Sequence, residues 1–379
     1  MKRRAFLTTT LSAAFAAPPD AAPLDLFESG SGGYALYRIP GIVTTPKGSI
    51  LAYCEARKAE KGDWGETNIL LRRSTDDGRT FSPATSIARV PGPIAENPAG
   101  IAQKLAAPGV LYDNPVAISD PKARCVHFLF CVEYMRAFHM RSGDDGLTWS
   151  APVEITSAFE QFRPEYPWQV IAIGPGHGIQ LSNGRLLAPV WLSTGTGGHA
   201  HRPSAASTIY SDDHGKTWHR GDIAVVNGPE CVNPSEGALA QLPSGEVMLN
   251  LRTETPSRRR TVLMSPDGAT HWTPPQPHPE LPEPVCFASL LADPNGKRLL
   301  FLNPDNFENR ERRNLAVRIS RDSGRTWPRK ITVDPGWAGY SDLALARDGS
   351  LLVFYERGAA GANHFQNRFL TLVRLRLPK

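Results

Sequence analysis

An eight-residue segment of the form Ser-x-Asp-x-Gly-x-Thr-aromatic recurs along this chain and limits the folds that it can adopt. Copies occupy residues 74–81, 142–149, 211–218 and 320–327, and a degenerate copy occupies residues 265–272. Self-similarity at a period of roughly 50 to 70 residues is typical of propellers and other repeat architectures. The chain is therefore expected to build one structural unit several times.

Each copy, named here an Asp turn, has the residues of a tight turn between strands. The Asp side chain accepts hydrogen bonds from the backbone that follows it, and the Gly adopts a positive φ. The Thr begins the next strand, and the aromatic ring packs beneath the turn. The carboxylates of Asp76, Asp144, Asp213 and Asp322 are expected to hold turns and not to catalyse. In the degenerate copy the glycine, Gly268, comes one residue early, so this turn is expected to differ.

A second repeated pattern predicts the rest of the unit. A glycine turn precedes an apolar run at residues 46–51, 182–187, 243–248, 294–299 and 347–352. Helical periodicity is nearly absent, and alternating short strands with regular turns indicate an all-β fold. Five or six units of about 60 residues account for nearly all of the chain, and we expect a six-bladed β-propeller of four-stranded antiparallel blades.

The two ends of the propeller are expected to meet. Residues 24–379 are interpreted as one domain, in which the alternating segment 368–377 pairs with the strand around residues 24–27 and closes the ring. Five cysteines are too few for a disulfide scaffold, and an odd number cannot all form pairs, so we expect buried thiols. A Cys125–Cys131 pair is the alternative. The domain is expected to be a monomer.

Residues 1–17 resemble a twin-arginine export signal. Lys2, Arg3 and Arg4 precede a short apolar stretch with a cleavage site after Ala16. The protein is therefore expected to be exported, periplasmic or secreted; a disordered basic tail is the alternative. Removal of the leader lowers the net charge from +5 to about +2, which gives no support for nucleic-acid binding. No apolar stretch reaches 18 residues, so no membrane span is expected.

Three arginines stand in contexts that suggest a binding socket. Arg38 lies in Tyr37-Arg-Ile-Pro-Gly41, Arg252 ends an apolar strand, and a third candidate lies within residues 310–315. The guanidinium group donates two parallel hydrogen bonds and keeps its charge, so arginines converging from separate blades would hold a carboxylate. Each such contact contributes about 1.5–3 kcal/mol.

With these motifs in this order, the chain resembles the sialidase (neuraminidase) superfamily of glycoside hydrolases from about Tyr34 to its end. The markers are Tyr-Arg-Ile-Pro at 37–40, the Asp turns (Asp-boxes, or BNR repeats, in that family), and the segments 174–181 and 340–343. The resemblance implies a retaining exo-α-sialidase that removes terminal sialic acids from glycans without a cofactor. We find no metal-ligand spacing and expect no metal site.

The resemblance also implies which residues bind the substrate carboxylate and attack the sugar. Arg38, Arg252 and Arg312 match the arginine triad, although the neighbouring Arg313 remains open as the third. Tyr340 matches the nucleophile. The anomeric carbon of a sialic acid bears a carboxylate that repels an anionic nucleophile, whereas a phenol approaches neutral; sialidases are the tyrosine exception among glycosidases.

Four further residues match supporting roles in the family. Glu236 matches the base that takes the proton of the tyrosine. Asp63 matches the general acid/base on a loop, with Glu66 as the alternative. Arg57 is expected at the same end of the pocket. Glu356 matches the counter-charge that a buried arginine needs.

The parts of the site that recognise the sugar substituents match less well. Asn114 matches a segment near the acyl-amino group, and Trp191 either stacks in the glycerol region or packs in the core. Two alternatives follow: a hydrolase or transferase for a related nonulosonic acid of the deaminated type, and a non-catalytic glycan-binding propeller. His199 and His201 are expected in a solvated loop, and residues 258–260 at an exposed hairpin tip.

Overall fold

The structure, a computed structural model, describes residues 22–105, 107–196, 198–293, 296–359 and 366–377. The predicted export signal at residues 1–17 lies outside the described residues. Within them the chain is almost entirely β, and the α-helices are α1 (Pro98–Ala102) and α2 (Thr156–Glu160). No helix in this part of the chain has the length and apolar character needed to cross a membrane.

Four sheets of mainly antiparallel strands follow one another along the chain. The first sheet contains β2 (Leu36–Thr44), β3 (Ile50–Arg57), β4 (Thr67–Ser74) and β5 (Thr85–Ser86). The second contains β6 (Tyr112–Asp120), β7 (Cys125–Val132), β8 (Arg136–Ser142), β9 (Val153–Glu154) and β11 (Gly176–His177). The third contains β10 (Val170–Ile173), β12 (Ile179–Gln180), β13 (Leu186–Ser193), β14 (Ser204–Ser211), β15 (His219–Arg220) and β16 (Val225–Val226). The fourth contains β17 (Gly237–Gln241), β18 (Val247–Leu251), β19 (Arg259–Ser265) and β20 (Gln276–Pro282).

A larger sheet completes the molecule and is named here the closing sheet. It contains β21 (Ser289–Ala292), β22 (Leu299–Pro304), β23 (Arg313–Ser320), β24 (Arg329–Leu345), β25 (Leu351–Arg357), β26 (Phe369–Leu375) and β1 (Leu24–Glu28). The long strand β24 pairs with β23 through its first half and with β25 through its second half.

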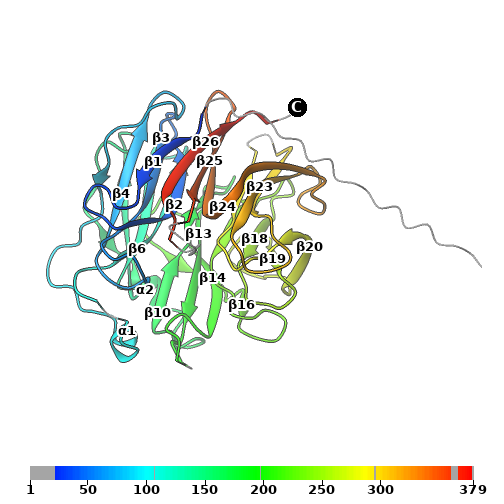
Figure 1. The fold of residues 1–379 in the computed structure, drawn as a ribbon. Coiled ribbons are helices and arrows are strands. Elements are labelled where there is room, and N and C mark those ends of the chain that lie inside the picture. Colours follow the sequence, from blue (N-terminus) through cyan, green and yellow to red (C-terminus); the bar gives the residue numbers. More distant parts are fainter. Residues whose placement is uncertain (1–21, 106, 197, 294–295, 360–365, 378–379) are drawn as a thin grey trace, which may run out of the picture.

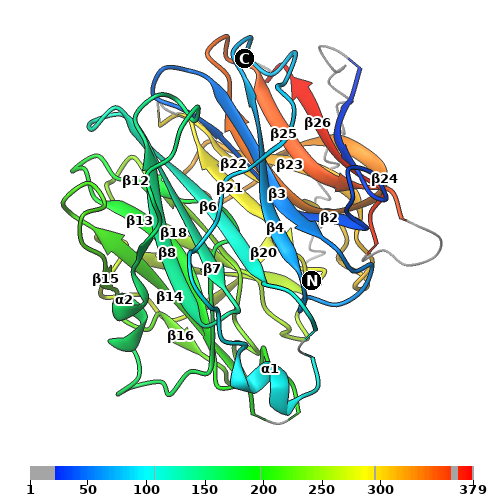
Figure 2. The ribbon, with the colours of Figure 1, turned by 90° about the vertical axis from the view of Figure 1, so that its left-hand side faces the viewer.

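The sheets lie around a common centre (Figure 1). In the side view, β6–β8 lie alongside β13 and β14 (Figure 2). Inner strands make a closed series of contacts, from β2 to β6, β13, β17, β21, β24 and back to β2. β1 pairs antiparallel with β26, with Leu24 opposite Leu372. The predicted pairing of the two ends is therefore confirmed.

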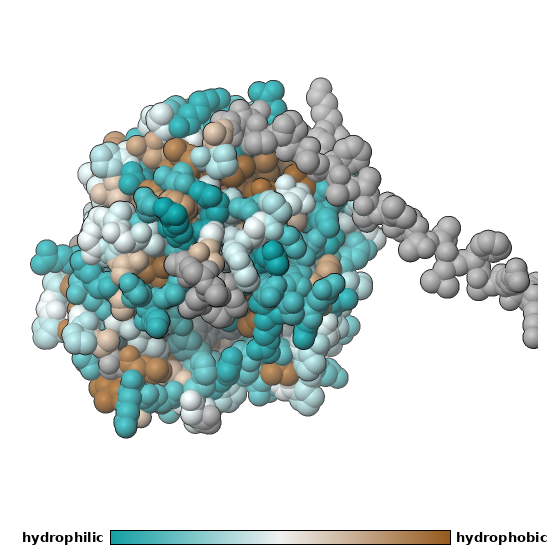
Figure 3. Space-filling view, viewed as in Figure 1, coloured by the Kyte–Doolittle hydropathy of each residue, from teal (hydrophilic) through white to brown (hydrophobic). Residues whose placement is uncertain are grey.

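Apolar side chains fill the spaces between neighbouring sheets. One cluster joins Leu51 and Tyr53 of the first sheet to Phe128 and Phe130 of the second. Burial of such side chains contributes about 25 cal/mol per Å² of apolar surface and holds each sheet against the next. Hydrophilic and apolar residues are interspersed on the surface that Figure 3 shows.

All five cysteines are buried and free. The prediction of buried thiols is therefore confirmed, and the alternative Cys125–Cys131 disulfide was wrong.

The Asp turns have the predicted chemistry. Asp144 accepts hydrogen bonds from Ser142 Oγ (2.8 Å), Thr148 N (2.9 Å) and Thr148 Oγ1 (2.5 Å). Hydrogen bonds from Thr148 and Ser142 lower the pKa of this carboxyl to about 2. Asp76, Asp213 and Asp322 make the same set of bonds.

The degenerate turn differs, as predicted. The N–H of Gly268 reaches Ser265 Oγ from three residues away, whereas the glycine of a full turn, such as Gly146, reaches its serine from four.

One expectation about the surface was wrong. Arg260, placed by the sequence at an exposed hairpin tip, is fully buried and forms an ion pair with Glu283 at 2.6 Å. Arg260 Nε also donates to Asn250 Oδ1 at 2.6 Å. The side chain points inward because alternate residues of β19 face the core, and its charge is matched there by a buried acid.

Gly146→Ala is expected to lower the free energy of unfolding by about 1–3 kcal/mol. Gly146 has φ 83°, and an added Cβ lies 2.6 Å from Leu51 Cδ2 of the first sheet. Gly143→Ala in the same turn is the matched control, because its Cβ meets nothing within 4 Å. Denaturant unfolding measures both variants, and an equal loss in the two would contradict this role of the turn.

Candidate active site

A pocket of about 540 Å³ lies where the inner ends of the sheets converge. Cationic, acidic and aromatic side chains line it: Arg38, Ile39, Arg57, Asp63, Asn114, Tyr134, Trp191, His201, Glu236, Arg252, Arg312 and Tyr340. A wider hollow of about 880 Å³ shares several of these residues and continues past His199, Arg202, Asn233, Glu254 and Arg310. The sequence-predicted site residues therefore come together, from strands far apart in the chain.

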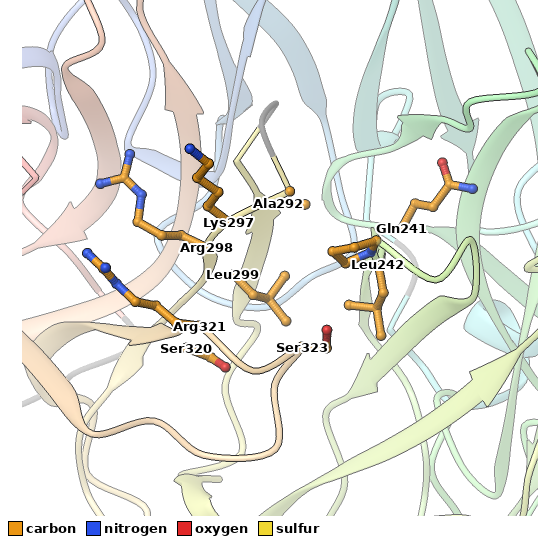
Figure 4. Close-up of a pocket in the computed structure, with 11 residues that line it drawn as sticks. Gln241, Leu242, Ala292, Lys297, Arg298, Leu299, Ser320, Arg321 and Ser323 are labelled. Carbon is orange, nitrogen blue, oxygen red and sulfur yellow. The ribbon is translucent and has the colours of Figure 1, made fainter. Parts of the chain in front are cut away.

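A smaller hollow between the fourth and closing sheets has cationic but neither acidic nor aromatic side chains in its described lining (Figure 4). Its described lining includes Leu242, Leu299, Arg298 and Arg321 but no carboxylate, imidazole or phenol.

The centre of the pocket is the hydroxyl group of Tyr340. It donates a hydrogen bond of 2.5 Å to Glu236 Oε1 and accepts one of 2.5 Å from Arg252 Nη1. Arg252 Nη1 also donates to Glu236 Oε2 at 2.6 Å. The guanidinium carbons of Arg38 and Arg312 lie 5.2 and 5.0 Å from the centroid of the tyrosine ring. Three cations thus surround one phenol that is hydrogen-bonded to a carboxylate.

The surroundings of Tyr340 keep its phenol protonated. Burial raises the pKa of the phenol, and the carboxylate of Glu236 raises it further. The positive charge of Arg252 lowers the pKa, but the net pKa lies above the ordinary value. At neutral pH the phenol therefore carries the proton that it donates to Glu236. The hydrogen bond provides a direct path for this proton to leave when the oxygen reacts.

Glu356 holds both the first arginine and the tyrosine in place. Its Oε1 accepts from Arg38 Nε at 2.7 Å and from Ile39 N at 3.2 Å, and its Oε2 accepts from Tyr340 N at 3.0 Å. Burial alone would lower the pKa of Arg38, but Glu356 outweighs it and raises the pKa. Ile39 has φ 58°, a strained conformation for a β-branched residue, at a bulge in β2. A Cβ on Gly339 would lie 2.3 Å from Glu356 Oε2, which explains the glycine there.

Arg312, and not Arg313, faces the pocket. Arg312 is buried and donates from Nη2 to Val285 O at 2.7 Å. The side chain of Arg313 is 46% exposed and lies 3.7 Å from Glu311. Adjacent residues of an extended segment face opposite sides, so only one of the two reaches the site.

Asp63 lies across the pocket on the loop after β3. Its Oδ1 accepts from Arg57 Nη1 at 2.8 Å, and Arg57 Nη2 is bonded to Glu55 Oε2 at 2.6 Å. Glu55 Oε1 in turn accepts from the backbone N–H of Asn114 at 2.9 Å. The alternative acid, Glu66, is not among the residues that line the pocket.

The charges around Asp63 favour its ionised form. Desolvation raises the pKa of this carboxyl, but the permanent charges of Arg57 and Arg38 outweigh it and hold the pKa below its ordinary value. The carboxyl is therefore ionised at neutral pH in the free protein.

Aromatic rings form one wall of the pocket, and most of them escaped the sequence analysis. Tyr134 lies 4.9 Å from Trp64 and 5.0 Å from His201 between ring centroids, and Trp191 lies 5.2 Å from His201. Trp191 packs in this cluster and also lines the pocket, so the predicted core packing is confirmed and stacking in the glycerol region stays a prediction. The expectation of a solvated loop was wrong for His201: burial lowers the pKa of His201 to about 4, and the ring is neutral at pH 7. No sequence signal identifies Tyr134; Trp64 directly follows Asp63.

Comparison of this chain with known protein families and structures identifies its class. Residues 98–353 match the BNR repeat-like domain family. The chain is 29% identical over 375 residues to a sialidase of Micromonospora viridifaciens and 32% identical over 359 residues to a sialidase of Bacteroides fragilis. These alignments cover 90% and 88% of this chain. The solved structure of Hadza microbial sialidase Hz136 superposes with a TM-score of 0.74 at 27% identity, over 94% of this chain and 68% of that one.

The chain belongs to the BNR-repeat, or sialidase, superfamily. It spans 53% and 62% of the lengths of the two bacterial relatives, less than two thirds of each.

Glu356→Gln is expected to lower the free energy of unfolding by about 3–5 kcal/mol, because it leaves the buried charge of Arg38 without its partner. Glu311→Gln is the matched control: the same substitution at the exposed Arg313 pair is expected to cost no more than about 1 kcal/mol. Denaturant unfolding at neutral pH compares them. If both variants were as stable as the parent protein, Glu356 would not support the site in this way.

Proposed function

We propose that this protein is a retaining exo-α-sialidase that hydrolyses terminal sialic acids from glycans. The observation that carries the proposal is the Tyr340–Glu236 hydrogen bond enclosed by Arg38, Arg252 and Arg312. A structural pocket has no need of three arginines around a phenol, whereas an anionic sugar with a reactive centre beside its carboxylate requires both.

We further infer that the closing sheet counts as two blades that share β24, which gives six blades with the other four sheets. Residues 24–379 then form one propeller domain, exported and monomeric. The closed series of inner-strand contacts supports this count.

In the proposed complex the arginine triad binds the substrate carboxylate. The guanidinium groups approach from β2, from the end of β18 and from the start of β23, so they meet the anion from different directions. Such charge-assisted bonds fix the anomeric carbon next to the tyrosine oxygen.

In the first step, the oxygen of Tyr340 attacks the anomeric carbon and its proton passes to Glu236. The bond to the leaving oxygen breaks, and Asp63 donates a proton to that oxygen. The products are an alcohol and an aryl glycoside in which the tyrosine oxygen is bonded to the anomeric carbon, with the sugar carboxylate still held by the arginines.

In the second step, water attacks the same carbon and loses a proton to Asp63. The phenolate of Tyr340 departs and recovers its proton from Glu236. Two displacements at one carbon restore its configuration, and every group returns to its starting state.

Asp63 must gain its proton when substrate binds, since it is ionised in the free protein. The bound carboxylate offsets the positive field of Arg38 and its neighbours, which removes part of the cause of the lowered pKa. Substrate binding therefore prepares the acid.

Substrate comparisons test the sugar specificity. The aromatic wall of Tyr134, Trp191 and His201 supports recognition of an apolar substituent, as an N-acetyl group provides. Rates on N-acetylated and deaminated substrates, with and without an acceptor sugar, separate the sialidase from a hydrolase or transferase for a related nonulosonic acid. Sugar binding with no turnover of a fluorogenic sialoside would favour the non-catalytic alternative.

Tyr340→Phe is expected to lower kcat by about three or more orders of magnitude while it leaves binding of an unsaturated sialic-acid analogue within about tenfold. The nucleophile is lost, but the carboxylate site is kept. Tyr210→Phe, on β14 and outside the pocket, is the control. Full activity of Tyr340→Phe on a sialoside with a poor leaving group would refute the role.

Binding of the same analogue at mildly acidic pH is expected to take up protons, because the pKa of Asp63 rises from a lowered value. Calorimetric titrations in buffers of different ionisation enthalpy measure the uptake. Asp63→Asn should reduce it, and Glu66→Gln, which changes the neighbouring acid, should not. Equal uptake in Asp63→Asn and the parent protein would assign the proton elsewhere.

A further inference from the structure

A cluster of metal-ligand side chains lies outside the pocket, at the turn between β6 and β7. Asp120 ends β6, Cys125 begins β7 opposite it, and His127 follows on the same strand. Their ligand atoms all lie within 4.8 Å of one another, and all three residues are buried. A carboxylate, a thiol and an imidazole thus face one point.

The spacing of these atoms is that of a zinc site. Cys125 Sγ lies 3.5 Å from His127 Nε2, which lies 3.2 Å from Asp120 Oδ2. Tetrahedral zinc, with Zn–N near 2.0 Å and Zn–S near 2.3 Å, places neighbouring ligand atoms about 3.3–3.6 Å apart. Two of the three atom pairs already match this spacing, and the third, Asp120 to Cys125, lies within 4.8 Å and closes when an ion binds.

A fourth candidate ligand lies in the next sheet beside Asp120, and its ring must turn toward Cys125 and His127 to share an ion with them. His214, within the third Asp turn, has Nδ1 at 2.8 Å from Asp120 Oδ2. Its side chain is 43% exposed, whereas Asp120 and His127 are inaccessible. The exposed imidazole gives an ion a path from solvent to the buried donors.

Neighbouring groups orient the ligands as outer-shell partners do in zinc sites. Asp120 Oδ1 accepts from Gln180 Nε2 at 2.7 Å and from Ala123 N at 2.8 Å, so that Oδ2 is left to face the histidines. His127 Nδ1 lies 2.9 Å from His139 Nε2, which directs His127 Nε2 toward the thiol and carboxylate.

Three of the other Asp turns are attached to the preceding sheet by arginine, and at the turn of residues 320–327 His278 Nε2 lies 2.9 Å from Gly324 O. Arg374 donates to Asp77 O, Arg73 Nε to Asp145 O at 2.7 Å, and Arg185 Nη1 to Asp267 O at 3.3 Å. His214 follows Asp213 as Asp77 follows Asp76, so it takes the same place in the third turn. Here the partner across the junction is the cluster on β6 and β7, which lies beside β13 and β14 (Figure 2).

We propose that Asp120, Cys125, His127 and His214 bind one zinc ion, which joins the second sheet to the third Asp turn. Binding replaces the proton on Cys125 Sγ, which goes to solvent; the ring proton of His127 moves to Nδ1, which faces His139, and that of His214 moves to Nε2. The ion is structural, because four protein ligands leave no open position for substrate.

The test uses the full chain, freed of metal with a chelator and then dialysed with Zn²⁺. About one zinc ion per chain is expected by elemental analysis, together with a higher Tm. With Co²⁺ in its place, absorption from a sulfur-to-cobalt transition is expected. His214→Ala, at an exposed position that leaves the core intact, should weaken Zn²⁺ binding at least about tenfold.

Two matched variants locate the site. Cys125→Ser should abolish the cobalt absorption, and Cys131→Ser, a buried free thiol on the same strand, should keep it. A His199→Ala, His201→Ala double variant should still bind one ion. The proposal is overturned if the parent chain retains no zinc, or if Cys125→Ser and His214→Ala bind it as the parent does.

Discussion

The proposed site depends on the ion pair and the hydrogen bonds that the carboxylate of Glu356 makes. It binds Arg38, 318 residues away in the chain, together with the backbone of Ile39 and Tyr340. These contacts join the first sheet to the closing sheet. Asp342 adds a second buried link between the same sheets, since it accepts from Ile42 N at 2.9 Å, and it also accepts from Ser289 Oγ at 2.7 Å. The contacts that join these two sheets therefore also assemble the site.

Buried acids allow so many arginines to occupy one end of the molecule. Arg38 is paired with Glu356, Arg57 with Glu55, and Arg252 with Glu236. Each pair offsets the cost of taking a guanidinium group out of water, and the remaining N–H groups face the pocket. The pocket consequently favours an anion without depending on a large net charge of the protein.

The sequence predicted what repeats or lies in a local motif. The Asp turns and the meeting of the two ends follow from turn chemistry and strand alternation, and the motif around Arg38 identified one wall of the pocket. Arg312 and Arg313 were not separable, because the choice depends on where β23 begins. His201, Tyr134 and Arg260 were missed, since each owes its position to strands that the chain order does not bring together. The cluster at Asp120 was missed for the same reason, because His214 comes from another sheet.

Strand β24 joins the two halves of the closing sheet in one continuous strand. Its 17 residues run without a loop from the part that pairs with β23 to the part that pairs with β25. A shift of this strand along its axis would therefore disturb both pairings. Tyr340 lies on this strand, so its phenol is held by a segment that has pairing partners in both halves of the closing sheet.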